Sequence, residues 1–114
     1  MRKTITLEGG KAVDLAANAA TPFRFKQLFN TDLLKIFKQS TENEEDQTDL
    51  ADVITQLAYI MNRQAEGADM NKISMDDFYT WLEDYEPMDF ITVGDKVVDV
   101  YMASAKVSVE AKKK

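Results

Sequence analysis

The chain contains no cysteine and no histidine. Without cysteine it has no disulfide framework, no thiolate metal site and no cysteine nucleophile, a composition that suits a reducing compartment. Without histidine it also lacks the commonest acid/base group at neutral pH and the commonest metal ligand. Carboxylates, lysines and tyrosines would have to carry any chemistry. The composition therefore argues against an enzyme, and we expect no catalytic, metal-binding or cofactor-binding residue.

Long apolar runs and glycine-rich loops are missing as well. The N-terminal stretch MRKTITLEGGK has no apolar run after its charged start, unlike a secretory signal, and no segment is long enough to span a bilayer. Gly9-Gly10 is not followed by a helix and is therefore not a phosphate-binding loop. We expect the protein to stay in the compartment where it is made, without a membrane partner.

The remaining composition fits one folded domain. With 114 residues, of which 45% are hydrophobic and 30% charged, the chain can close a single core and is too apolar to be wholly disordered. We expect a single globular domain over residues 1–108, followed by a frayed lysine-rich tail at 109–114.

Charge is distributed unevenly along the chain. Residues 1–38 hold seven Lys or Arg and three acids, a balance of +4, whereas residues 39–114 hold seven and seventeen, a balance of −10. The two parts can attract each other within the fold, which needs no partner; the alternative is that the basic part is presented to an acidic partner. The acidic field of the whole chain opposes approach to a polyanion, so we expect no nucleic-acid partner.

Residues 3–16 are predicted to form a β-hairpin. Two short runs alternate apolar and polar residues, with the apolar ones at Ile5, Leu7, Val13 and Leu15. Gly9-Gly10 lies between the runs and tolerates the positive φ of a tight turn. Because two strands alone are only marginally stable, the apolar face of the hairpin must lie on helices.

Helical periodicity follows the hairpin in four regions, at about residues 22–38, 49–65, 75–85 and 87–106. The last region has an expected interruption near Gly94. Between the first two regions, the stretch QSTENEEDQT at residues 39–48 has no apolar residue and is expected to be a surface loop. The predicted fold is α+β and mainly α: an N-terminal β-hairpin packed on a bundle of four to five short helices.

Helix-capping residues mark two of the predicted helix starts. Thr21 is expected to be the N-cap of the first helix, with Pro22 at its first position. Ser74 is expected to cap the third helix, with Asp77 completing an approximate capping box. Thr31 could cap a second helix within residues 22–38, so that region is either one helix or two.

One acidic stretch can be tested as a calcium site. DMNKISMDDFYT is similar to an EF-hand loop, but a start at Asp69 puts Ser74 instead of glycine at the sixth position and Thr80 at the twelfth. The other register puts Ala68 and Met70 at ligand positions. Both registers fail, and the acids are better explained as favouring the N-terminus of a helix.

The stretch that joins the hairpin to the loop interleaves phenylalanines with cations. At helical spacing, Phe25 and Phe29 fall on one face and the cations on the other. The phenylalanines are therefore expected in the core, except Phe23, which lies off that stripe. If the chain binds a partner through this stretch, the expected contact residues are Phe23, Arg24, Lys35 and Lys38.

The order of several segments resembles a known family. A hairpin with ITL and GK, then NAATPFRFKQLFNTDLL, QLAYIMNRQA, DFYTWLEDYEPMDF, VVDVYMASAK and a terminal lysine run resembles the tail assembly chaperones of long-tailed phages and prophages of Gram-positive bacteria. The resemblance covers nearly the whole chain. Its weight rests on the order of the segments, the chain length and the ending.

This resemblance implies a non-enzymatic assembly factor in the cytoplasm of the bacterial host, absent from the mature virion. Such a factor binds the tape measure protein, keeps it soluble and helps to recruit subunits of the major tail tube protein. Families of this type often make a longer product by ribosomal frameshifting, and the codons for residues 112–114 are the place to look for a slippery sequence. The chain itself, or its extended form, is then a further partner.

Three alternatives belong to other functional classes. The chain could be a structural head–tail connector or tail-completion subunit, which would remain in purified particles. It could be an acidic regulatory module that binds a host protein. An enzyme using paired carboxylates, such as Asp76-Asp77 or Glu83-Asp84, is the remaining alternative, although adjacent residues on a helix point in different directions.

Overall fold

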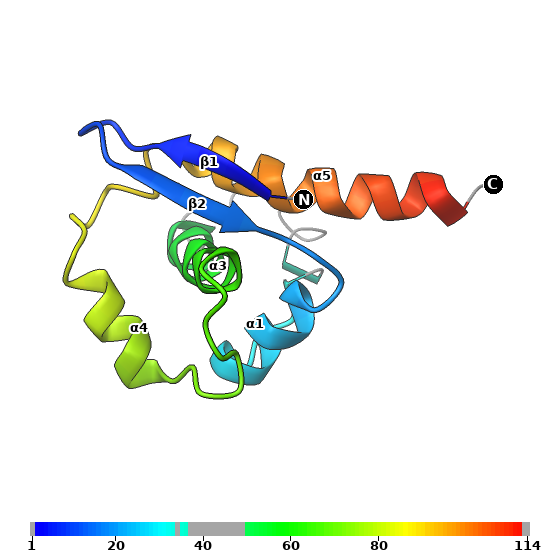
Figure 1. Cartoon of the computed structure of the whole chain (residues 1–114), viewed down its shortest axis with the longest axis horizontal. Coiled ribbons are helices and arrows are strands. Elements are labelled where there is room, and N and C mark those ends of the chain that lie inside the picture. The colour runs from blue at the N-terminus through cyan, green and yellow to red at the C-terminus, as the bar shows by residue number, and fades with distance from the viewer. Residues whose placement is uncertain (1, 34, 37–49, 113–114) are drawn as a thin grey trace.

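The computed structural model describes residues 2–33, 35–36 and 50–112 of the chain, and of residues 50 and 105–112 it describes the helical backbone alone. The secondary-structure elements are β1 (Arg2–Thr6), β2 (Ala12–Ala16), α1 (Thr21–Phe29), α3 (Leu50–Ala65), α4 (Met75–Leu82) and α5 (Gly94–Lys112) (Figure 1). The predicted α+β, mainly α fold is confirmed. The surface loop expected at residues 39–48 lies outside the described residues. Among the described helices, none combines the length and apolar character that a bilayer span requires.

The two strands form the predicted antiparallel hairpin. Ile5 lies opposite Val13, and Gly10 in the turn between the strands has a φ of 94°. The alternating apolar side chains all point to one face and are buried: Ile5, Leu7, Val13 and Leu15. On the other face, the Thr4 hydroxyl donates to Asp14 Oδ1. The alternation in the sequence therefore predicted the correct buried face of the hairpin.

Helix α3 is the centre of the fold. In Figure 1 it is seen nearly along its axis, with the hairpin above it, and it contacts β2, α1 and α5. Five consecutive side chains, Leu57 to Met61, are fully buried, so the middle of this helix is enclosed on every side. Burial of each large apolar side chain contributes about 1.5–3 kcal/mol, which makes this stretch the main hydrophobic anchor of the chain.

One polar side chain lies within this enclosed stretch. Asn62 is 3% exposed. Its Nδ2 donates to the Asp14 carbonyl oxygen at 2.9 Å, and its Oδ1 accepts from Trp81 Nε1 at 2.9 Å. A single amide thus connects α3 to the hairpin on one side and to α4 on the other. This role could not be predicted from the sequence, because Asn62 occurs in an otherwise ordinary amphipathic pattern.

The start of α1 differs from the expected cap. The residue before the helix is Ala20, which makes no side-chain capping bond, and Thr21 is the first helical residue. The Thr21 side chain is fully buried; its hydroxyl donates to Gln64 Oε1 at 2.9 Å and accepts from the Asn18 backbone N–H at 3.0 Å. Thr21 therefore stabilises the contact between α1 and α3, and the prediction that it caps α1 was wrong.

Residues 22–38 do not form one continuous helix. Helix α1 ends at Phe29 because Asn30 adopts a left-handed conformation with φ 53°, and its backbone N–H bonds the Lys26 carbonyl. Asp32 then accepts from the Lys35 backbone N–H at 3.2 Å, capping a helical turn that includes Leu33 and Ile36. Of the two alternatives, the interruption occurs, with Asp32 instead of Thr31 as the capping side chain.

The last helical region starts later and continues further than predicted. Residues 88–93 form turns, and α5 begins at Gly94 instead of being interrupted there. A Cβ added at Gly94 would lie 2.9 Å from Ile54 Cδ1, so the missing side chain allows α5 to start close to α3. Helix α5 extends to Lys112, past the predicted end at residue 106 and into the expected tail at 109–114; residues 113–114 lie outside the described part of the chain.

We expect Asn62→Ala to lower the free energy of unfolding by about 2–4 kcal/mol, because it leaves Trp81 Nε1 and the Asp14 carbonyl without partners and opens a small cavity. Urea denaturation followed by circular dichroism measures the change. Gln27→Ala, at an exposed position on α1, is the control and should stay within about 0.5 kcal/mol. Equal stability of the two variants would contradict the role assigned to Asn62.

Candidate partner-binding groove

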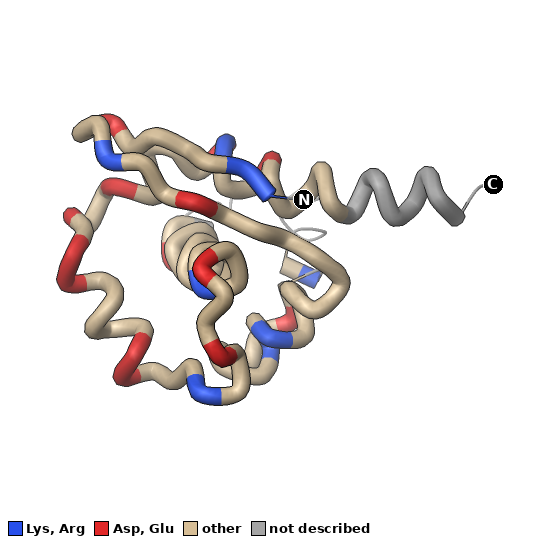
Figure 2. The backbone as a smooth tube through the Cα atoms, viewed as in Figure 1, with Lys and Arg blue, Asp and Glu red and all other residues tan. Residues whose placement is uncertain are grey.

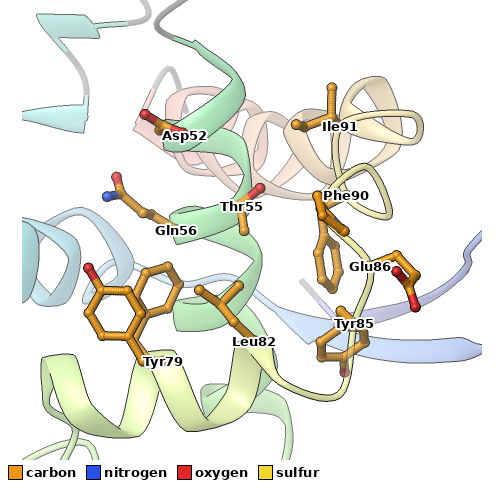
Figure 3. A pocket seen from close by; sticks show the side chains of 11 residues that line it. Asp52, Thr55, Gln56, Tyr79, Leu82, Tyr85, Glu86, Phe90 and Ile91 are labelled. Atoms are coloured by element: carbon orange, nitrogen blue, oxygen red, sulfur yellow. The ribbon is translucent and has the colours of Figure 1, made fainter.

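A pocket of about 500 Å³ lies between α3, α4 and residues 85–91. Figure 3 shows Thr55 and Gln56 on α3 facing Tyr79 and Leu82 on α4, with Phe90 on the connecting segment. Most of the lining is apolar or aromatic, from Phe78, Tyr79, Leu82, Tyr85, Pro87, Phe90 and Ile91; the polar lining residues are Asp52, Thr55, Gln56 and Glu86. We call this pocket the α3–α4 groove.

The floor of the groove is an aromatic cluster shared with the hydrophobic core. The Trp81 and Phe90 rings stack with centroids 5.1 Å apart and planes at 20°. Tyr85 lies against both, 4.7 Å from Trp81 and 4.8 Å from Phe90. Phe78 extends the cluster towards α3, with its ring 5.1 Å from that of Tyr59. Because these rings hold one another, the floor is fixed by the fold itself.

The hairpin turn supports the groove from behind. Lys11 Nζ donates to the Asp84 carbonyl at 3.0 Å and lies 4.3 Å from the centroid of the Tyr85 ring. This combination of a hydrogen bond and a cation–π contact holds the segment that leaves α4 against the hairpin. The chain then turns at Glu86, whose backbone N–H donates to Asp89 Oδ2 at 2.9 Å. Together these contacts bring the chain back towards α4, so that Phe90 lies in the floor of the groove.

The first turn of α4 is fixed to α3. As predicted, Ser74 caps α4: its Oγ accepts from the Asp77 backbone N–H at 3.1 Å. In place of the reciprocal bond of a capping box, Asp77 Oδ2 accepts from the Tyr59 hydroxyl at 2.5 Å and lies 3.2 Å from Arg63 Nε. Arg63 also pairs with Glu66, at 3.2 Å. The carboxylate of Asp77 is therefore used to position α4, and only the Ser74 half of the expected capping box is confirmed.

Exposed apolar side chains gather beside the groove. The described residues have five large apolar side chains that are exposed, at Phe23, Met75, Tyr79, Met88 and Met102. Three of the five belong to α4 or the segment after it. Met75 and Tyr79 are four residues apart and so share one face of α4, and Tyr79 is 60% exposed while it lines the groove. The apolar wall of the groove is therefore open to solvent along α4.

Acidic residues flank this apolar surface. Residues 73–94 contain six acids and no Lys or Arg, and Figure 2 shows only Asp and Glu coloured along α4 and the segment that follows. Within the described residues, only one of the six, Asp77, takes part in an ion pair. Two acids line the groove itself, Asp52 and Glu86, and both are exposed. The groove is apolar inside and acidic at its edges.

The partner-binding residues expected from the sequence, as far as the structure describes them, lie outside this groove. Phe23 is 74% exposed on α1, as predicted. Arg24 does not project freely, because its guanidinium donates to Asn71 Oδ1 at 3.1 Å and to the Met70 carbonyl at 3.5 Å. Lys35 is exposed, and Lys38 lies outside the described residues. None of the three described residues, Phe23, Arg24 and Lys35, lines the α3–α4 groove.

The sequence predicts a helical region over residues 75–85 but does not show the groove that Phe78, Leu82 and Tyr85 line. Two signals were present in the sequence: the spacing of Met75 and Tyr79, and the absence of any cation from residues 73–94. In the described part of the chain, no group of three or more acids is arranged to hold a metal ion.

Comparisons of the chain with protein-family models, with curated proteins and with solved structures find no match. The chemistry of the groove therefore has to be argued from its own residues.

We expect Arg24→Ala to lower the free energy of unfolding by about 1 kcal/mol, because it removes the hydrogen bonds from α1 to Met70 and Asn71. Lys35→Ala removes an exposed cation and should change stability by less than about 0.5 kcal/mol. Melting temperatures from circular dichroism compare the two. Equal melting temperatures would show that Arg24 has no structural role.

Alkaline pH should destabilise the fold through its buried tyrosines. Burial raises the pKa of Tyr59, and the adjacent Asp77 carboxylate raises it further; burial also raises the pKa of Tyr85, with Glu66 adding to the effect. A phenol whose pKa is raised by folding contributes its full stabilisation at pH values below its pKa in the unfolded chain, about 10. This stabilisation is lost as the pH rises through the higher pKa of the folded state.

The free energy of unfolding, measured by urea titration at a series of pH values, should therefore fall above about pH 10. The fall should be less steep for Tyr59→Phe, which has one fewer buried phenol to titrate. Identical slopes for the wild type and the variant would contradict the contribution assigned to Tyr59.

Proposed function

We propose that the chain is a tail assembly chaperone of a long-tailed phage or prophage. In this role it binds the tape measure protein in the bacterial cytoplasm, keeps it soluble, helps to recruit tail tube subunits and is absent from the mature virion. The observation that carries the proposal is the α3–α4 groove, an apolar pocket of about 500 Å³ with acidic edges. The order of the sequence segments, which resembles such chaperones, supplies the family and the partner.

The proposed mechanism is binding without a reaction. Apolar side chains of a partner helix would leave water by packing on Tyr79, Leu82 and Ile91, while the surrounding acids remain hydrated. A complex of this kind keeps a negative surface, because the whole chain has a net charge of −6. An aggregation-prone helical protein would stay in solution for as long as its apolar segments are covered.

Coexpression with the tape measure protein of the same phage or prophage tests the proposal. With the wild-type chain, most of the tape measure protein should be in the soluble fraction and copurify with it, whereas alone it should be mostly in the pellet. Tyr79→Ala should reduce the soluble fraction several-fold, because it removes the exposed aromatic wall of the groove. A tape measure protein equally insoluble with and without the chain would refute the proposed function.

Phe23→Ala is the matched control, because Phe23 is also aromatic and exposed but does not line the groove. It should leave the soluble fraction unchanged. Loss of solubility with Phe23→Ala and not with Tyr79→Ala would move the binding surface to α1, the face expected from the sequence. Mass spectrometry of purified virions separates the chaperone from a connector or tail-completion subunit, because only the latter would be recovered in stoichiometric amounts.

A longer form of the chain, made by frameshifting at the codons for residues 112–114, belongs to the same proposal. This form would contain the same groove followed by additional sequence, and it could bind the tail tube protein while the groove holds the tape measure protein. An overlapping reading frame behind an adenine-rich heptamer in the coding DNA would support it.

A further inference from the structure

We propose that the α3–α4 groove selects an amphipathic helix with basic residues flanking its apolar face. The identity of the partner rests on the proposed function: the helix would be a Lys- or Arg-bearing segment of the tape measure protein. The chemistry of the partner does not rest on that function, because it follows from the shape and the charge of the groove.

The walls of the groove favour a helix over an extended peptide. An extended peptide binds by adding to a free strand edge, whose backbone groups form its hydrogen bonds. The groove has no strand in its lining; its walls come from α3, α4 and residues 85–91. Backbone donors and acceptors within α3 and α4 are used inside the helices. What the walls offer is apolar side chains, which is what the i, i+3, i+4 and i+7 positions of a docked helix require.

The size and rigidity of the groove suit several large apolar side chains. Its volume of about 500 Å³ lies within the range of specific binding pockets. Its floor is held by the packing of Trp81 against Tyr85 and Phe90, so little order has to be imposed on the groove when a helix binds. Tyr79 lines the groove with 60% of its surface exposed and therefore has surface left to bury when a helix binds.

Charge then decides which amphipathic helix fits. Asp52 on α3 and Glu86 after α4 lie on different sides of the groove in Figure 3, and no Lys or Arg lines it. A helix that puts its apolar face into the groove brings its flanking residues next to these carboxylates. Lys or Arg at those positions is attracted by both edges, whereas Glu or Asp is repelled. The groove thereby distinguishes basic from acidic helices of equal hydrophobicity.

A second copy of this chain is a poorer occupant. Its basic helix is α1, but Phe25 of that helix is already buried in the core and Arg24 is bonded to residues 70 and 71. The exposed residues of α1 are Phe23, Lys26 and Gln27, so a single apolar side chain accompanies its cation. The face that these residues form lacks the apolar stripe that the groove would bury.

Binding of designed peptides to the intact chain tests the inference. The probes are two synthetic helices of about 18 residues with the same Leu and Phe stripe, one flanked by Lys and the other by Glu, both without Trp. Trp81 is the only tryptophan and touches two groove residues, so its emission reports on occupancy. The Lys-flanked helix should bind about tenfold more tightly than the Glu-flanked one, and less tightly as salt is raised.

Neutralising the carboxylates at the edges of the groove should remove the preference for the Lys-flanked helix. Asp52→Asn combined with Glu86→Gln should weaken binding of the Lys-flanked helix about fivefold. Glu8→Gln combined with Asp99→Asn changes the net charge equally at exposed positions outside the groove and should stay within about twofold. Amide chemical shifts should change on α3, α4 and residues 85–91.

Equal affinity for the two helices, or equal loss in the two double variants, would overturn the inference. Self-association that is abolished by Tyr79→Ala would also overturn it, because the occupant would be a second copy. If the peptides fail these criteria while the chain still keeps the tape measure protein soluble, the inference fails and the proposed function stands. If the Lys-flanked helix binds as expected but the tape measure protein stays insoluble, the groove chemistry stands and the proposed function fails.

Discussion

The all-round burial of the middle of α3 is the constraint from which the other elements take their positions. A helix with Leu57 to Met61 fully buried needs cover on every side, and the hairpin, α1, α4 and α5 supply it. Asn62 sits next to this stretch, and an amide left there without a partner would cost about 1–3 kcal/mol. The Asp14 carbonyl and Trp81 Nε1 both have to be in place, which fixes α4 relative to the hairpin. The α3–α4 groove is the space that this arrangement leaves between α3 and α4.

The elements that could be predicted from the sequence are those whose own pattern decides their structure. The hairpin alternates with period two, and α3 carries an uninterrupted apolar pattern, so both were located closely. The helix ends were harder, because they depend on contacts with distant residues. Thr21 turns inward to Gln64, and Gly94 approaches Ile54, and neither pairing is visible in a local window. The left-handed Asn30 that ends α1 belongs to a residue type that tolerates this conformation without requiring it.

The candidate site shows the same division between local and distant information. Phe23, Arg24 and Lys35 were expected to bind a partner because they are close in sequence. In the structure, however, the Arg24 side chain is not free, because it donates a hydrogen bond to Asn71. The groove is assembled from residues around positions 52–56, 78–82 and 85–91, which only the packing of α4 on α3 brings together. What the sequence did contain was the chemistry of the site, an acidic stretch without cations and an aromatic-rich helix. Its location required the tertiary structure.

The uneven charge distribution along the chain does not lead to ion pairs between its basic and acidic parts in the described structure. Attraction between the basic and the acidic part was the simpler expectation, yet the ion pairs found in the described part of the chain join Arg2 to Asp14 and Arg63 to Glu66 and Asp77, so none crosses that division. The cations that do reach the acidic part, Lys11 and Arg24, bond to carbonyl and amide oxygens there. Apart from Asp77, the carboxylates of residues 73–94 thus have no ion-pair partner in the described part of the chain, beside an exposed apolar wall. A partner that covers the apolar wall leaves part of this negative charge at the surface of the complex. The same region can therefore remove apolar side chains of the partner from water and keep complexes apart by charge repulsion.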